Sequence, residues 1–76
     1  MRKYAVIEEG RYTADIIRDK EIGYGRVLRN FLNGINSILV EVETDREDFI
    51  PIEELKDAKV ILNGGIFFAL KEVNHE

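Results

Sequence analysis

Cations and one aromatic residue are interleaved between positions 18 and 29, and this pattern suits binding better than catalysis. The residues are Arg18, Lys20, Tyr24, Arg26 and Arg29. An aromatic ring stacks on a base while cations follow the phosphate backbone, so the pattern suits single-stranded nucleic acid. It equally suits an acidic protein surface. In a third interpretation, these cations pair with acidic residues of the same chain.

Residues for nucleophilic catalysis are scarce. Ser37 is the single serine, and His75 is the single histidine. A catalytic triad needs a histidine held rigidly beside its nucleophile, and a position next to the chain end does not provide this. A carboxylate pair such as Glu41 and Glu43 would need a pocket that shifts its pKa values. We therefore predict that the protein is not an enzyme.

No metal or cofactor is expected either. The chain has no cysteine, which excludes thiolate ligation and thiol chemistry. Asp45, Glu47 and Asp48 lack the spacing and central glycine of a calcium loop, and Arg46 among them repels cations. The glycines at positions 23 and 25 lack the third glycine of a dinucleotide-binding loop, and no Walker lysine follows them.

Length and charge narrow the class of protein. A chain of 76 residues predicts one small globular domain, residues 1–76. The longest apolar runs, Ile38–Val40 and Ile66–Leu70, are too short to span a bilayer, so no membrane association is expected. The absence of cysteine is typical of a cytoplasmic protein, and we expect that location.

The net charge of −4 is unevenly distributed along the chain. Residues 1–40 carry seven Lys and Arg against five Asp and Glu, whereas residues 41–76 carry four against ten. The acidic second half argues against general affinity for nucleic acid, which needs several cations on one face.

The elements that must position these residues are mostly strands. Apolar and polar residues alternate in several short segments, as expected of half-buried strands. Pro51 fits a strand end followed by one helical turn. The strands are expected at positions 4–7, 12–18, 38–43, 49–50, 60–62 and 66–72, with a helical turn near Ile52–Lys56. The second half of this series resembles that of an SH3-like small β-barrel, which is the predicted fold; its predicted core is Val40, Val42, Ile50, Leu55, Ile61 and Phe68.

The segment 22–35 supports two interpretations. As a helix, it has an apolar stripe formed by Val27, Leu28, Phe31, Leu32 and Ile35, with position 34 as a glycine cap. As strands, it contains an Asn-Gly hairpin signal at positions 33–34. The barrel pattern downstream favours strands, which we predict. The alternative is an α+β fold with a helix near Arg26–Asn33 packed on an antiparallel sheet. This helix would begin after the glycine at position 25, because glycine is unfavourable inside a helix.

These observations favour a non-enzymatic protein-binding module, a small regulatory or accessory protein. Tyr24, Arg26, Arg29 and Arg18 are its candidate contact residues. The alternative is a nucleic-acid-binding small barrel that uses the same face together with its lysine at position 20. Phe67 would point outward from a late edge strand, which predicts a homodimer that covers it.

Overall fold

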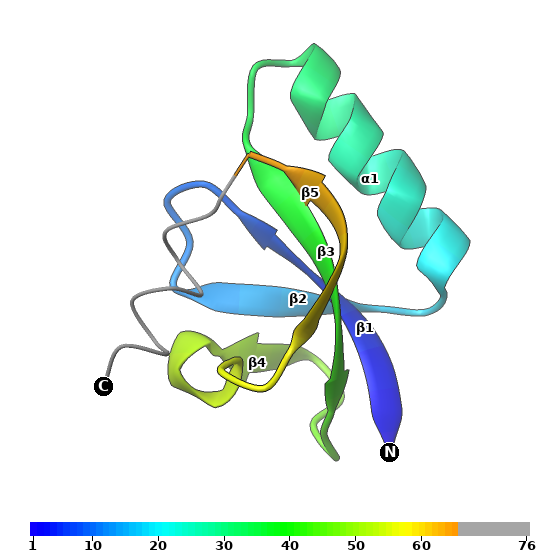
Figure 1. Cartoon of the computed structure of the whole chain (residues 1–76), viewed down its shortest axis with the longest axis vertical. Coiled ribbons are helices and arrows are strands. Elements are labelled where there is room, and N and C mark those ends of the chain that lie inside the picture. Colours follow the sequence, from blue (N-terminus) through cyan, green and yellow to red (C-terminus); the bar gives the residue numbers. More distant parts are fainter. Residues whose placement is uncertain (66–76) are drawn as a thin grey trace.

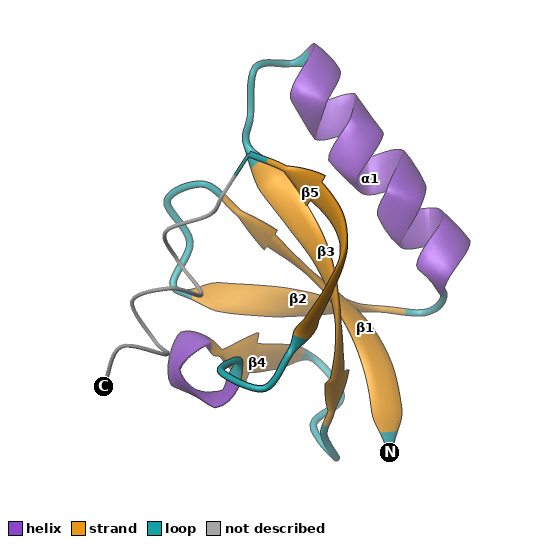
Figure 2. Ribbon diagram, viewed as in Figure 1, coloured by secondary structure: helices purple, strands orange, loops and turns teal. Residues whose placement is uncertain are grey.

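Five antiparallel strands form one sheet, and a single α-helix packs on one of its faces (Figure 1, Figure 2). The computed structural model describes residues 1–65. In chain order, the elements are β1 (Arg2–Glu8), β2 (Thr13–Ile17), α1 (Lys20–Leu32), β3 (Ser37–Glu43), β4 (Phe49–Pro51), a 3₁₀-helix (Ile52–Glu54) and β5 (Lys59–Gly64).

The strand order in the sheet is β4-β2-β1-β3-β5. The central strand β1 is antiparallel to both β2 and β3, so those two strands run in the same direction, and α1 connects them across β1. Strands β4 and β5 form the two edges of the described sheet, which is therefore not a closed barrel. The SH3-like barrel is not confirmed. The alternative expectation, a helix on an antiparallel sheet, describes the fold.

The two faces of the sheet carry separate apolar clusters. Away from the helix, the buried side chains are Ala5, Ile7, Ala14, Ile38, Val40, Val42, Ile50 and Leu55. On the helix side, Val6 and Leu39 pack with Val27, flanked by Tyr4, Ile17, Ile61 and Leu62. Successive strand residues point to opposite faces, so β1 and β3, which are apolar at consecutive positions, need cover on both sides.

Four of the six predicted core residues, Val40, Val42, Ile50 and Leu55, are buried in one cluster. Ile61 is partly buried on the helix side instead. Strand β5 pairs Leu62 with Leu39 and Val60 with Val40, which makes Ile61 the extra residue of a β-bulge. A β-bulge changes the direction in which side chains point, and here it places Ile61 on the helix side of the sheet, together with Leu62. Phe68 lies outside the described residues.

The prediction of strands over residues 22–35 is wrong, because most of this segment is helical. Asp19 caps the helix, accepting a hydrogen bond at Oδ1 from the Ile22 amide at 2.9 Å. At the other end, Gly34 has a φ of +78° and donates from its amide to Phe31 O, while the Ile35 amide donates to Asn30 O. This is a Schellman cap, which the helical interpretation predicted. The Asn-Gly pair ends a helix here and does not turn a hairpin.

The helix also begins earlier than the alternative predicted, at Lys20, and contains both glycines. A Cβ atom at Gly23 would lie 2.4 Å from Ile17 Cδ1 and 2.5 Å from Leu39 Cδ1. The helix therefore leaves no room for a side chain between Gly23 and the sheet, and close packing on β2 and β3 outweighs the low helix propensity of glycine.

The remaining strands and the helical turn after Pro51 occur where they were expected, although the turn is shorter than predicted and ends at Glu54. No helix within residues 1–65 is long and apolar enough to cross a membrane. The predicted strand at positions 66–72 lies outside the described residues.

Candidate functional site

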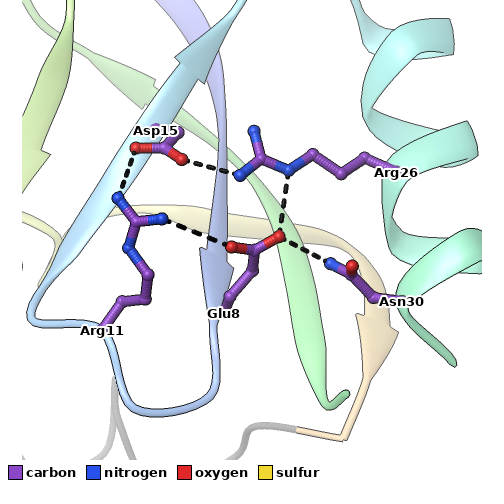
Figure 3. A network of polar contacts seen from close by, with 5 residues as sticks. All are labelled: Glu8, Arg11, Asp15, Arg26 and Asn30. Carbon is purple, nitrogen blue, oxygen red and sulfur yellow. Dashed lines mark hydrogen bonds and ion pairs between the residues drawn. The ribbon is translucent and has the colours of Figure 1, made fainter. Parts of the chain in front are cut away.

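Helix α1 has a polar flank that faces the sheet. Arg26 donates from Nε to Glu8 Oε2 at 3.0 Å and from Nη2 to Asp15 Oδ2 at 2.7 Å (Figure 3). Asn30 donates from Nδ2 to the same oxygen of Glu8 at 2.8 Å. Arg11, in the turn between β1 and β2, contacts Asp15 at 3.1 Å and Glu8 at 3.5 Å. Two carboxylates and two guanidinium groups thus balance each other across the helix–sheet boundary.

The electrostatics of this cluster make Glu8 a fixed anion. The hydrogen bond from Arg26, helped by the one from Asn30, lowers the pKa of Glu8 below its ordinary value. The same bond to Glu8, followed by the one to Asp15, raises the pKa of Arg26. Glu8 therefore stays ionised at neutral pH and accepts hydrogen bonds from neighbours that are already in place. This arrangement suits attachment of the helix to the sheet.

The five residues expected to form a basic face do not meet in one patch. Arg26 is engaged with acidic residues of its own chain, as in the third interpretation of the sequence. Tyr24 is two residues away along the helix, so the two side chains project in roughly opposite directions. Arg29 is exposed in the last turn, and Lys20 is exposed at the start of the helix. Arg18 lines a shallow hollow with residues of β1, including Arg2, Lys3 and Tyr4.

The other flank of the helix is apolar and exposed to solvent. We call it the apolar flank; it consists of Tyr24, Leu28, Phe31 and Leu32 on the helix, together with Ile35, three residues beyond the helix end. Leu28 is 59% exposed, Phe31 66% and Leu32 75%. Leu28, Phe31 and Leu32 follow Tyr24 by four, seven and eight residues, which is the spacing of one helical stripe. Such a stripe normally faces a core, and a contiguous exposed one marks an interaction site.

The inward-facing positions of the helix explain why the stripe is not covered. They are occupied by Gly23, Val27 and Asn30, which are small or polar apart from the valine. The helical interpretation of the sequence placed Val27 in one stripe with Leu28, Phe31, Leu32 and Ile35, but Val27 faces the sheet and is buried, whereas the other four are exposed. Hydrophobic spacing therefore shows that an apolar stripe exists. Whether the stripe faces the sheet or solvent depends on Glu8 of β1, which binds Arg26 and Asn30 on the opposite side of the helix.

Gly25 lies beside the apolar flank, on the same side of the helix as Leu28 and Leu32 three and seven residues later. Apart from its chain neighbours and the backbone of its own helix, no atom of the described structure lies within 4 Å of a Cβ placed there, and its φ is not in the left-handed region. Neither the packing nor the backbone conformation of the described chain thus requires a glycine at this position. Its absent side chain leaves a notch in the surface of the helix.

Phe67, the remaining predicted contact residue, lies outside the described residues. Among residues 1–65, no three acidic or histidine side chains are grouped so that they could hold a metal ion. The chain matches no protein-family model, no curated protein and no solved structure.

Proposed function

We propose that this protein is a non-enzymatic protein-binding module, a small accessory or regulatory protein whose partner docks on the apolar flank of α1. The observation that carries the proposal is the exposure of Leu28, Phe31 and Leu32, all more than half exposed, on one side of a well-capped helix. Burying one such side chain contributes roughly 1.5–3 kcal/mol. An apolar helix face of this kind fits a complementary apolar surface of another protein.

Nucleic-acid binding through Arg18, Lys20, Tyr24, Arg26 and Arg29 has less support. Arg26 is neutralised by two carboxylates, and Tyr24 belongs to the apolar flank. The remaining cations are spread over two ends of the helix, whereas phosphate binding needs cations along one path.

The test is a double substitution that removes the apolar flank and keeps the helix. Leu28→Glu with Phe31→Lys introduces two good helix formers whose charges attract each other at i, i+3. A matched control replaces two exposed aromatic residues outside the helix, Tyr12→Lys with Phe49→Glu. Circular dichroism should show that both variants fold.

Affinity capture from nuclease-treated host extract, quantified by mass spectrometry, then compares the two variants with the original protein. We expect a protein that the original and the control retain and that the flank variant loses. If every captured protein is retained equally by the flank variant, the apolar flank is not a docking surface. If capture depends instead on added oligonucleotide and falls steeply with salt, the nucleic-acid alternative is correct.

A further inference from the structure

We propose that the partner of the apolar flank is a second copy of this chain, and that two α1 helices pack antiparallel about a two-fold axis at Leu28. This inference rests on the proposed function and specifies its partner. A two-fold interface uses the same surface on both subunits, so that surface must be complementary to itself. The apolar flank has this property.

The self-complementarity follows from positions on either side of Leu28. In an antiparallel pair centred there, residues equally far before and after Leu28 face each other across the axis. Four residues away, Tyr24 meets Leu32 of the second copy. Three residues away, Phe31 meets Gly25 of the second copy. Between Tyr24 and Leu32, each large side chain of the stripe is thus opposite a partner that accommodates it. Seven residues from the axis, Ile35 lies opposite the exposed Glu21 of the second copy, at the edge of the contact.

In this arrangement, the missing side chain of Gly25 makes room for the second helix. A glycine within a helix is unfavourable relative to alanine, and no other element or side chain of the described chain lies near this one. Helices pack with their axes about 8–10 Å apart, with side chains of one inserted between those of the other. The notch at Gly25 is the place on this surface where the ring of Phe31 from a second helix fits without displacing a side chain.

The exposed area of the apolar flank reaches the lower limit for a specific dimer. The exposed fractions of the apolar flank range from 38% to 75%. At about 150–250 Å² for a whole large side chain, its five residues present roughly 500 Å² per copy. Complete burial of these side chains in two copies would remove roughly 1,000 Å² from solvent, which is the lower limit for a specific interface. Arg26 is held toward Glu8, so its charge need not be desolvated.

Disulfide trapping tests the geometry directly, because the chain contains no cysteine. Leu28→Cys alone should cross-link two copies under mild oxidation, since the axis places the two thiols side by side. Tyr24→Cys mixed with Leu32→Cys should give a cross-linked heterodimer in higher yield than either variant alone. Glu53→Cys, on the exposed 3₁₀-helix, is the matched control and should remain uncross-linked.

Sedimentation velocity across a dilution series measures the association itself. The original protein should be dimeric at high concentration and dissociate on dilution. Gly25→Gln fills the notch with a good helix former, so the variant should stay helical while its dimer dissociates at about tenfold lower affinity or worse. A dimer unaffected by Gly25→Gln, or cross-linking at the control position alone, would overturn the proposed packing.

The outcomes also separate this inference from the proposed function. A protein that is monomeric at every concentration, yet loses a captured partner when Leu28 and Phe31 are replaced, refutes the dimer and leaves the docking surface supported. A dimer that persists in that double variant pairs through another surface, which refutes the inference. A monomer whose captured proteins do not depend on the flank refutes both.

Discussion

The contact between Glu8 and Arg26 should be one of the strongest polar contributions to the stability of this fold. Glu8→Gln and Arg26→Gln, made singly and together, each remove one charge. Glu8→Gln also keeps the size of the original side chain. In the folded protein, Arg26 Nε lies 3.0 Å from Glu8 Oε2, and its Nη2 lies 2.7 Å from Asp15. The double-mutant cycle isolates the coupling between the first pair.

The magnitude follows from the burial of the two side chains. Glu8 is 17% exposed and Arg26 is 30% exposed, so water screens the pair only in part. Exposed ion pairs contribute about 0–1 kcal/mol, whereas hydrogen bonds to charged groups contribute about 1.5–3 kcal/mol. We expect a coupling of about 1–2 kcal/mol between these limits. Each single substitution should cost about 1–3 kcal/mol, because it leaves a partly buried charge without its partner.

The pH dependence has a defined sign. Since the pKa of Glu8 is lowered in the folded protein, the folded state binds its proton less readily than the unfolded chain does. The stabilisation is therefore complete above the ordinary glutamate pKa of 4.5 and is lost as the pH falls from there through the lowered value. Arg26 stays charged throughout this range. Glu8→Gln should accordingly lose less stability in this acidic window than the original protein.

Urea denaturation followed by circular dichroism, at neutral pH and in the acidic window, provides all four corners of the cycle. The exposed pair Arg46–Glu54, with nitrogen and oxygen 2.8 Å apart, is the matched control and should show a smaller coupling. Additivity of Glu8→Gln and Arg26→Gln within about 0.5 kcal/mol would refute the reasoning. So would an acidic loss of stability that Glu8→Gln leaves unchanged.

Further predictions concern helix α1. Gly23→Ala should destabilise the protein by about 1–2 kcal/mol because its methyl group meets Ile17 and Leu39, whereas Gly25→Ala, measured at concentrations where the chain is monomeric, should stabilise it by about 0.5–1 kcal/mol. Equal effects of the two substitutions in thermal melts would show that helix propensity alone governs both. Asp19→Ala removes the cap and should cost about 1 kcal/mol in urea denaturation; an unchanged midpoint would show that the cap contributes nothing.

The strands could be predicted from the sequence because their signal is local. Alternation along β3 and the position of Pro51 depend on neighbouring residues only. The prediction for the segment of α1 is wrong because it follows the barrel pattern downstream, although the local periodicity favours a helix and Asn33-Gly34 fits both a hairpin turn and a helix end. Helix propensity predicts that Gly23 destabilises a helix. In the folded chain, Gly23 instead allows the helix to pack closely on Ile17 and Leu39, which only the fold brings together.

The candidate site could be predicted only in part, for a related reason. Helical spacing shows that Leu28 and Phe31 share a side of α1, but not whether that side faces the sheet. Arg26 looked available for a partner because its own partner, Glu8, is 18 residues earlier in the chain. No pattern within the helix specifies that contact, since it depends on the register that places β1 beside β2 and beneath the helix.

The rotation of α1 about its own axis links the polar cluster to the apolar flank. Burial of Leu28 and Phe31 against the sheet would remove apolar surface from water, and area alone favours that orientation. It would also draw Arg26 and Asn30 away from Glu8 and leave a partly buried carboxylate without its hydrogen bonds, which is costly. It would furthermore bring a larger side chain to the place beside Ile17 and Leu39 where only a glycine fits. The polar contacts and the glycine thus select the orientation in which the apolar flank faces outward, where a partner can cover it.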